Sequence, residues 1–364
     1  MSNHRFTGWN TSVTTYMEPE LAVDAAVPLN RPGEILSPAA FLLLMEGLSY
    51  AIFSVGVVGI IGNSLIIVTY SMVGFSDSVN MSYLAMAVSD LGCVASIVWS
   101  GLCWNPPFQS LLALAAREVV LPTGGFSTTA FAKVTALTTA FVSLERCLCV
   151  VFPFKVKTLI THKRTMYFIV LNYVVHIFPA TLVYIAVRFK WKFDEQTNRT
   201  VLGVTYMQTA KERSLVDFIW LFYSLPLQFI PLITVVVCTI FLVINLNKSA
   251  QWRKEYSSGN PQVGQNRRGS KSRARSREDR IGKTVVVIAI VFIVCSSPAA
   301  LNNASTRAQP EHRATGQYRN LNLFVAGSLA CLNALNSSVN VFIYYGMSSK
   351  FKTALNKLFC LVDN

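Results

Sequence analysis

The amino-acid sequence predicts an all-α membrane protein, in which a bundle of seven transmembrane helices is followed by a short amphipathic eighth helix. Composition is the first reason: 52% of the 364 residues are hydrophobic, only 14% are charged, and the mean hydropathy of +0.43 is too high for a soluble globular protein. The second is that the apolar residues gather in seven long stretches. Within lipid each stretch must satisfy its own backbone hydrogen bonds, which favours helices over open strands.

The seven apolar stretches are each long enough to cross ~30 Å of hydrocarbon as a helix, which takes roughly 20 residues. We expect the spans at about 41–71, 80–103, 119–151, 165–187, 215–246, 282–304 and 321–345. The chain then divides into an N-terminal tail (1–40), the bundle (41–345) with a third inner loop at about 247–281, and a C-terminal segment (346–364).

Positive charge is distributed unevenly over the loops, and this predicts the orientation. The loops at 152–164 and 247–283 and the tail after 346 hold 18 Lys and Arg residues, whereas the segments on the opposite side hold 12. The excess marks the first side as cytoplasmic and places the N-terminus outside. The sequons at Asn10 and Asn198 then lie outside, where we expect glycosylation.

An ionic pair, Glu145-Arg146, stands near the inner end of the third span in the stretch SLERCLCVVFPFK (143–155). A charge in a membrane segment is costly, so it is usually paired or placed at a water-filled cavity. Because Pro153 and a basic run follow, the pair lies about one to two turns from the cytoplasmic surface. Arg146 can reach the interface there while carboxylates hold it.

A second charge, Lys133, lies 13 residues before Arg146 and therefore roughly 20 Å further outward along the same helix. At mid-membrane depth an ammonium group has a water shell only if it points into a cavity, so it is a functional candidate. Thr128, Thr129 and Ala132 would make that cavity small and polar. Our hypothesis is that Lys133 is the counter-ion of an acidic ligand, such as a carboxylate metabolite, an acidic amino acid or a peptide C-terminus. The alternatives are a neutral lysine and one satisfied by internal carbonyls and water.

The segment after the last span, SSKFKTALNKLFC (348–360), predicts an amphipathic helix that lies in the membrane interface. Its apolar residues alternate with lysines at helical spacing. The apolar residues are Phe351, Leu355, Leu358 and Phe359, and the lysines are Lys350, Lys352 and Lys357. At its end, Cys360 is a candidate for a palmitoyl anchor in contact with membrane lipids.

Several short motifs appear in the order in which the rhodopsin-like (class A) G-protein-coupled receptors carry them, and the chain resembles that family over residues ~45 to 360. The motifs are Gly62-Asn63, LAMAVSDL (84–91), Glu145-Arg146-Cys147, Pro231, Phe292 with Cys295-Ser296-Ser297-Pro298, and NSSVNVFIYY (336–345). The resemblance implies a plasma-membrane receptor for an extracellular ligand, with a heterotrimeric G protein and arrestin as partners.

Four departures from the family pattern make the resemblance closest to divergent invertebrate orphan or chemosensory-type receptors. Leu121 stands where the family has a cysteine at the outer end of the third span, and the loop at 188–214 has no cysteine to pair with it. We therefore expect no outer disulfide. Ser296 replaces the family's tryptophan in the sixth span, Val341 replaces the proline of the seventh, and the fourth span lacks its usual tryptophan.

The resemblance also implies a buried polar cluster that holds a sodium ion and water in the family. Such polar groups are too costly to face lipid, so they must converge inside the bundle. The matching residues are Asp90, Thr135, Asn336, Ser337 and Asn340, with Asp90 as the candidate sodium ligand and Ser296 near the floor of the ligand site. The alternative is a hydrogen-bond network without a cation.

At the cytoplasmic side the resemblance implies a switch. Arg146 would be held by Glu145 and by Glu278, which lies 20 residues before Pro298. Breaking the pair while the sixth helix swings outward would create an active state that an agonist binds better. Tyr344 would swing inward to stabilise that state, and Asn340 belongs to the same motif. The alternative is that Glu278 only offsets the neighbouring basic run.

The third inner loop contains NRRGSKSRARSREDR (266–280), which predicts disorder or an extension of the flanking helices. Three interpretations stay open: contact with anionic lipids, docking of a G protein or arrestin, and phosphorylation at Ser270, Ser272 or Ser276. The formal net charge of +14 lies on membrane loops, so we expect no nucleic-acid partner.

Two rival classes fit the sequence less well. A seven-helix transporter or ion channel would need several charged or discontinuous positions along a path, yet only Asp90, Lys133 and the Glu145-Arg146 pair lie deep, and the two halves do not look like repeats. An enzyme would need a cluster of catalytic or metal-binding side chains, whereas the four histidines are scattered. We therefore predict a receptor rather than an enzyme, with no cofactor beyond the candidate sodium ion.

Overall fold

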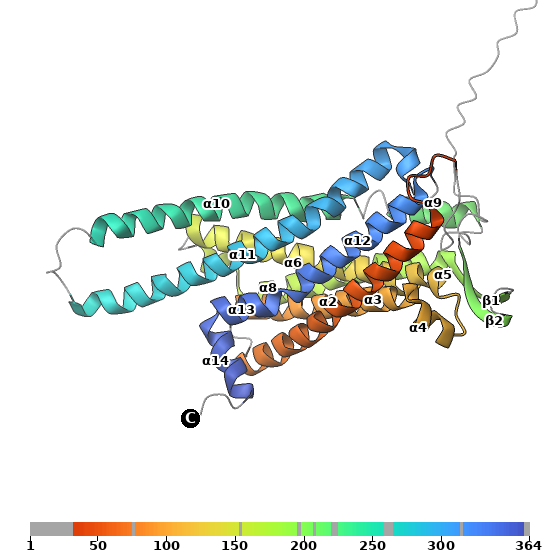
Figure 1. Cartoon of the computed structure of the whole chain (residues 1–364). Coiled ribbons are helices and arrows are strands. Elements are labelled where there is room, and N and C mark those ends of the chain that lie inside the picture. The colour runs from red at the N-terminus through yellow and green to blue at the C-terminus, as the bar shows by residue number, and fades with distance from the viewer. Residues whose placement is uncertain are drawn as a thin grey trace, which may run out of the picture.

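A computed structural model describes residues 32–74, 77–152, 155–194, 198–206, 209–219, 225–257, 265–313 and 316–359. Within these ranges, seven helical segments are long and apolar enough to cross a membrane. They run side by side as one elongated bundle (Figure 1). The predicted fold class, a seven-helix membrane bundle, is confirmed.

The first two spans begin at residues whose side chains cap a helix. Ser37 accepts a hydrogen bond from the Ala40 amide and caps α2 (Pro38–Val73), which starts with proline. Asp77 caps α3 (Ser78–Trp104) in the same way, and short α4 (Pro106–Leu111) follows. The third span joins α5 (Ala116–Val120), a π-helical turn η2 (Leu121–Gly125) and α6 (Phe126–Val151).

The remaining spans follow in order. The fourth is α8 (His162–Leu182) with η3 (Val183–Ala186), the fifth lies in α10 (Pro226–Ser257), and the sixth lies in α11 (Gln265–Ala308). The seventh joins α12 (Arg319–Ser338) to α13 (Asn340–Met347). Short helices α7 (Val156–Leu159), α9 (Ala210–Phe218) and η5 (Pro310–His312) lie between spans, and α14 (Ser349–Leu358) ends the described chain.

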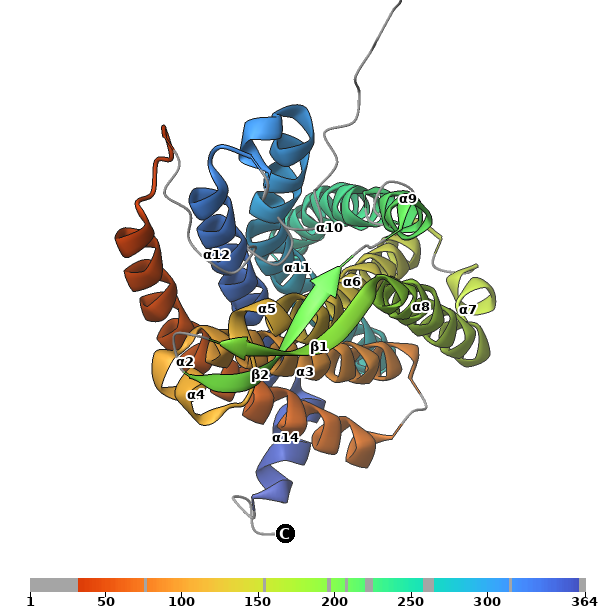
Figure 2. The same cartoon turned by 90° about the vertical axis from the view of Figure 1, so that its right-hand side faces the viewer.

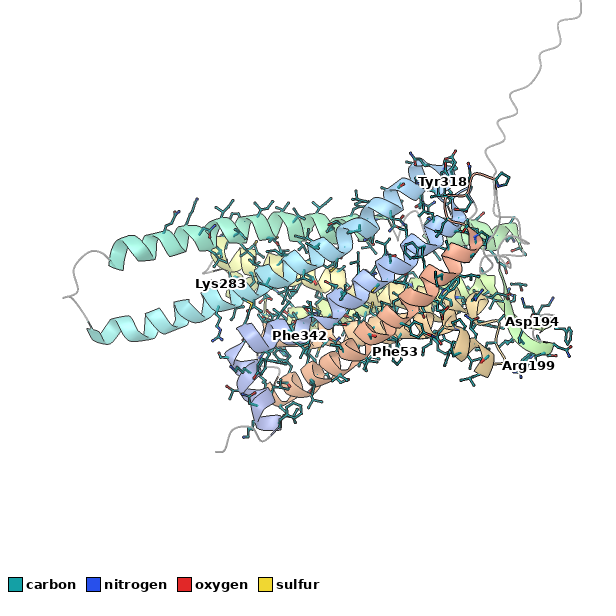
Figure 3. All side chains as sticks on the ribbon, in the orientation of Figure 1. Phe53, Asp194, Arg199, Lys283, Tyr318 and Phe342 are labelled. Carbon is teal, nitrogen blue, oxygen red and sulfur yellow. The ribbon has the colours of Figure 1, made fainter. Side chains whose placement is uncertain are left out.

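A β-hairpin marks one end of the bundle, which we call the outer end; α14 marks the inner end (Figures 1 and 2). Strand β1 (Val187–Asp194) pairs antiparallel with β2 (Arg199–Tyr206). The pair crosses the outer end of the bundle in the view along its length (Figure 2). Asp194 and Arg199 lie at its tip (Figure 3).

Large apolar side chains cover the outer surface of the bundle, as lipid contact requires. Phe53 on α2 and Phe342 on α13 are 45% and 63% exposed and lie on that surface (Figure 3). The fourth span is the least buried of the seven, with only 11% of its most apolar window inside the bundle. In a membrane these exposed groups face hydrocarbon, so they carry no penalty.

Glycines on α2 allow close packing against α3 and the seventh span. A Cβ added at Gly59 would lie 2.2 Å from the Ser338 hydroxyl and 3.1 Å from the Val94 side chain. We expect Gly59→Ala to destabilise the purified protein by about 1–3 kcal/mol, because packed residues must move to admit the methyl group. Gly47→Ala is the matched control on the same helix, since nothing lies within 4 Å of its added Cβ. Equal unfolding temperatures for the two variants would contradict this packing.

The fifth span differs from the prediction at its outer end. We expected it from about 215, whereas the spanning helix begins at Pro226 and residues 210–218 form the separate helix α9. The part of α9 that falls inside the predicted span contains the charged residue Asp217, which is unfavourable in a membrane segment. A proline also suits a first helical turn.

The third inner loop is helical wherever it is described. The helix α10 continues to Ser257 and α11 starts at Gln265, so both extend well beyond the inner end of the bundle (Figure 1). Extension of the flanking helices was one of the two expected outcomes. The side chains of Ser270, Ser272, Ser276 and Glu278 lie outside the described part of the structure.

The predicted amphipathic eighth helix is present as α14, capped by the Ser348 hydroxyl, which accepts a bond from the Phe351 amide. Phe351 and Leu355 are buried against the bundle, whereas Phe359 is 52% exposed. The apolar face therefore packs partly on protein rather than wholly on lipid. Cys360 and Asn10 lie outside the described residues.

Candidate functional site

A cavity of about 170 Å³ lies inside the bundle, between α3, α6, α10, α11 and α12. The five residues that the sequence singled out for ligand binding all line it: Thr128, Thr129, Ala132, Lys133 and Ser296. The structure therefore brings together side chains that are up to 168 positions apart in the chain. The charge and polar groups of the cavity indicate which class of ligand these residues can bind.

Lys133 is the cationic group of this cavity. Its side chain is inside the bundle, with the residue only 5% exposed, and it lines the wall from α6. Among the described residues that line the cavity none is acidic, and the other polar groups are hydroxyls and carboxamides. The carboxamides are those of Gln228, Asn303, Asn333 and Asn336. The cavity therefore offers one positive charge and several neutral hydrogen-bonding groups.

Sequence analysis missed Gln228, Asn303 and Asn333. Each is a neutral amide in a long apolar span, and such residues commonly hydrogen-bond between helices without binding anything. Their helical positions were the only available signal, because residues three to four apart share a helix face. Asn333 and Asn336 stand in that relation on α12, and Ser296, Ala299 and Asn303 do so on α11.

The polar cluster forms around Asp90, which lies on α3 three residues before Cys93, a residue of the cavity wall. The Asp90 side chain is fully buried. Its Oδ1 accepts hydrogen bonds from the Thr135 hydroxyl at 2.8 Å and the Ser337 hydroxyl at 2.9 Å, and its Oδ2 accepts from the Asn340 amide at 2.8 Å. Thr135 and Ser337 also line the cavity, so they connect the carboxylate to it.

Asn336 lines the cavity one residue before Ser337, and the described hydrogen bonds to Asp90 come from other residues. Asn63 supports the same region from α2: its amide donates to the Ser337 carbonyl at 2.8 Å. The cluster thus joins the first, second, third and seventh spans through buried hydrogen bonds. Four of the five residues predicted for it meet directly.

At the inner end, Glu145 and Arg146 form an ion pair of 2.8 Å between the Arg146 Nη2 and the Glu145 Oε1. The same oxygen accepts a hydrogen bond from the Ser78 hydroxyl at 2.7 Å. Glu145 is therefore fixed to the start of α3, and it holds Arg146 against the bundle. The predicted third member, Glu278, has its side chain outside the described part of the structure.

A second contact ties the sixth span to the seventh at this end. The Arg280 Nε donates to the Met347 carbonyl at 2.6 Å. Met347 is the last residue of α13, so the guanidinium caps the end of that helix, where the partial charge is negative. Sequence analysis did not find this contact, because a bond to a backbone carbonyl leaves no mark on the partner's residue type.

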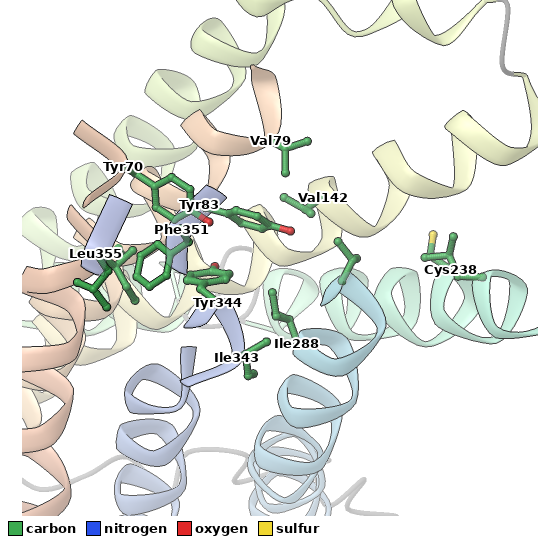
Figure 4. Close-up of a cluster of buried hydrophobic side chains, with 14 of the residues drawn as sticks. Tyr70, Val79, Tyr83, Val142, Cys238, Ile288, Ile343, Tyr344, Phe351 and Leu355 are labelled. Atoms are coloured by element: carbon green, nitrogen blue, oxygen red, sulfur yellow. The ribbon is translucent and has the colours of Figure 1, made fainter. Parts of the chain in front are cut away.

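Tyr344 is packed in an aromatic cluster at the inner end (Figure 4). Its ring centroid lies 4.7 Å from that of Tyr83, 5.7 Å from that of Tyr70 and 5.8 Å from that of Phe351. Its hydroxyl reaches the Met86 sulfur at 3.8 Å. Tyr344 of the seventh span thus packs against the first span, the second span and α14.

The predicted glycosylation site Asn198 lies in the turn of the hairpin, where its φ of 50° is accepted more readily by asparagine than by most residues. The residue is exposed at the outer end. That position leaves the side chain accessible to a glycan. No described contact of the cavity or of the inner end involves it.

Comparisons with known proteins agree with this architecture. The solved structure of squid rhodopsin matches with a TM-score of 0.59, covering 88% of this chain and 86% of that one at 16% sequence identity, which shows the shared fold. Among curated proteins, the Gq-coupled rhodopsin of Mizuhopecten yessoensis is 25% identical over 84% of this chain, which spans 58% of that rhodopsin's length. Growth hormone secretagogue receptor type 1 of Rattus norvegicus is also 25% identical, over 96% of this chain and 92% of its own.

A family model decides the assignment. The model described as "Serpentine type 7TM GPCR chemoreceptor Srw" matches residues 49–362, which include all seven spans but the first turns of α2. The resemblance to rhodopsin-like receptors that the motifs indicated is thereby confirmed, and the family and fold are those of a receptor rather than of an enzyme. The chain belongs to the serpentine-type seven-transmembrane G-protein-coupled chemoreceptors of the Srw family.

Proposed function

We propose that this chain is a plasma-membrane chemoreceptor, with its N-terminus outside, that binds an acidic ligand in the cavity at Lys133 and activates a heterotrimeric G protein. The observation that carries the ligand class is the buried Lys133 among neutral amides and hydroxyls. The cavity presents this cation to a ligand, and an opposite charge on the ligand would pair with it at low dielectric. A carboxylate ligand would supply that charge, and the amides would bond to its remaining polar groups.

A ligand screen tests this proposal. Cells that express the receptor are exposed to carboxylate metabolites, acidic amino acids, peptides with free C-termini and cationic amines, and a broad second-messenger response is recorded. We expect activity among the acids and a large loss of potency for the methyl ester of any active acid. An agonist that is a cationic amine would contradict the proposed ligand class.

We propose that α11 transmits the signal through the membrane, because it reaches both the ligand cavity and the contact with α13 at the inner end. Near its outer end it lines the cavity with Phe292, Ser296 and Asn303, and at its inner end it is tied to α13 by Arg280. Pro298 interrupts its backbone hydrogen bonding within the cavity-lining stretch, between Ser296 and Asn303. A ligand that binds better to an outward position of the inner half of α11 would populate that position and open the inner face to the G protein.

The hydrogen bond from Arg280 to the Met347 carbonyl opposes this movement, and its effect can be measured. We expect Arg280→Gln to raise basal nucleotide exchange on an added G protein several-fold, because a charge-assisted bond to a helix terminus, worth about 1 kcal/mol, favours the inward position. Lys283→Gln is the matched control: it removes the same charge from an exposed position three residues away (Figure 3). A basal rate that rises equally in both variants would indicate a charge effect and not this bond.

Glu278→Ala separates the predicted switch from the Arg280 contact. If Glu278 holds Arg146, this variant also raises the basal rate, and combining it with Arg280→Gln gives a further increase. If Glu278 only offsets the basic run of α11, its removal leaves the basal rate at the wild-type level at equal surface expression.

The residues around Asp90 fit a sodium ion, which we propose as a bound cation. Hard cations of this kind prefer oxygen ligands, and the site offers the carboxylate, two hydroxyls and the Asn336 carboxamide. A sodium ion would neutralise the buried carboxylate, whose described hydrogen-bond partners are all neutral. The residues themselves hold the second, third and seventh spans together.

The inner end provides the surface for the proposed intracellular partners. The extended inner parts of α10 and α11 form a basic projection, since α11 between 265 and 283 carries eight Lys and Arg residues. We propose that this projection contacts the G protein, arrestin or anionic lipid headgroups. The lysines of α14 add to the positive charge on the same side.

A further inference from the structure

The hairpin is fastened to the outer end of the third span without a cysteine. Leu121 stands at the family's cysteine position, and residues 188–214 contain none. Nevertheless the hairpin lies across the outer end of the bundle, above α3 and beside α5 (Figure 2). Its position therefore depends on contacts between described residues of the hairpin and of the segment before α6.

Backbone hydrogen bonds form the first of these contacts. The Leu202 amide donates to the Ala113 carbonyl at 2.9 Å, and the Ala115 amide donates to the Leu202 carbonyl at 3.0 Å. They make a parallel bridge between Leu114 and Leu202. The segment before α5 thereby acts as a third strand beside β2, and Leu202 is the residue that both bonds share.

The Glu118 carboxylate forms the second contact, because both of its oxygens bind the hairpin. Oε1 accepts from the Lys192 ammonium of β1, and Oε2 accepts from the Val204 amide of β2 at 3.3 Å. The Glu118 side chain is 12% exposed and that of Lys192 is 39% exposed, so water screens the pair only in part. One side chain of α5 thus reaches both strands.

Close approach and apolar packing complete the interface. A Cβ added at Gly203 would lie 2.8 Å from the Glu118 Oε2 and 2.8 Å from the Lys192 Cε, so a larger residue would displace the side chains of the ion pair. Beneath it, Val119, Val187 and Val204 form a buried cluster with Leu114 and Phe126 packed against it. Phe126 lies two residues before Thr128, which lines the ligand cavity.

We propose that Glu118 and Lys192 form a non-covalent clasp that positions the hairpin on the third span and takes the place of a disulfide. Glu118 is a positioning residue: it holds β1 through a charge and β2 through a backbone bond, and so sets the hairpin against the helix that carries Lys133. The attachment is independent of thiol redox state and sensitive to ionic strength. A disulfide would show the opposite sensitivities.

Hydrogen–deuterium exchange of the purified full-length receptor in nanodiscs tests the clasp directly. The readouts are the backbone amides of Leu202 and Val204, whose bonds the clasp protects. In Glu118→Gln and Lys192→Met we expect both amides to exchange about tenfold faster, since a hydrogen bond to a charged group is worth roughly 1.5 kcal/mol or more. Glu212→Gln is the matched control, because it breaks a different ion pair of the hairpin, Arg188–Glu212 at 2.8 Å, and should leave these amides unchanged.

Reversing the charges separates pairing from a general structural role. Glu118→Lys and Lys192→Glu alone should accelerate exchange at Leu202 at least as much as Glu118→Gln does. Together they should return it to within about threefold of wild type, because the ion pair reforms in the opposite sense. A double variant that exchanges as fast as the worse single variant would overturn the clasp.

The effects of salt and of a thiol reductant on exchange distinguish an ion pair from a disulfide. Raising the salt concentration from about 0.1 M to about 1 M shortens the screening length from ~10 Å to ~3 Å. We expect this to accelerate exchange at Leu202 in wild type and to have little effect in Glu118→Gln. A thiol reductant should leave the wild-type exchange unchanged. Acceleration by the reductant, or identical salt responses in both proteins, would contradict a clasp made by this ion pair.

Discussion

Replacing Lys133 by methionine is expected to reduce the potency of an acidic agonist about a hundredfold or more. Methionine fills a similar volume but leaves the ligand's carboxylate buried without a counter-charge, and removing one partner of a buried ionic hydrogen bond costs about 2–5 kcal/mol. The neutral groups of the cavity cannot replace it, since no second cation lies among the described residues that line it. A concentration–response curve for nucleotide exchange measures the change.

Two comparisons make the Lys133 result specific. Lys190→Met removes an exposed lysine from β1 and should leave potency unchanged. The methyl ester of the agonist should act equally weakly on wild type and on Lys133→Met, because neither complex then contains a buried ion pair. If Lys133→Met reaches the surface and responds to the acid with wild-type potency, Lys133 is not the counter-ion.

Asp90→Asn is expected to abolish the stabilisation of the receptor by sodium. If sodium is present at ten times its dissociation constant, binding contributes about 1.4 kcal/mol to the folded state. That corresponds to a rise of roughly 2–4 °C in the unfolding temperature. We expect this rise for the wild-type receptor in sodium chloride compared with choline chloride, and no difference for Asp90→Asn, whose amide lacks the charge that attracts the ion.

Glu145→Gln is the matched control for Asp90, because Glu145 is also a buried carboxylate of the bundle but is paired with Arg146. It should keep the full response to sodium. Were Asp90→Asn to keep the full response as well, the cluster would be a hydrogen-bond network without a cation. Asp90 would then serve only to accept the hydrogen bonds from Thr135, Ser337 and Asn340.

The seven spans could be predicted because the bilayer imposes one rule on all of them. A stretch of roughly 20 apolar residues has no other stable arrangement in hydrocarbon. The start of the fifth span was predicted too early for the same reason, since four of the residues at 215–219 continue the apolar pattern and only Asp217 interrupts it. Only the structure shows that α10 begins at Pro226.

The hairpin had a visible sequence signal that we did not use. The stretch VRFKWKFD (187–194) alternates cationic and aromatic residues, which is the period of a strand. Here Phe189, Trp191 and Phe193 are 47%, 65% and 60% exposed, while Lys192 of the other face pairs with Glu118. A rule that buries the apolar face would therefore have predicted the wrong side, because the partner of this strand is a carboxylate.

The candidate site also contains residues that could be predicted from the sequence and residues that could not. Lys133 and Asp90 could be found because a charge in an apolar span is rare and must have a reason. The amides of Gln228, Asn303 and Asn333 could not, because their residue types are common between membrane helices. The Arg280–Met347 bond depends on how two helix ends meet, which no local pattern records.

Nucleotide exchange by the purified receptor is the most direct test of the central claim, that ligand binding in the cavity is coupled to a G protein at the inner end. The full chain is reconstituted in nanodiscs with each class of heterotrimeric G protein, and guanine-nucleotide exchange is followed with and without the acid identified in the screen. We predict that the acid accelerates exchange at least tenfold on one class, and that Lys133→Met loses the acceleration while keeping its basal rate. Absence of exchange on every class, together with acid-dependent ion or solute flux through receptor-containing vesicles, would contradict the account.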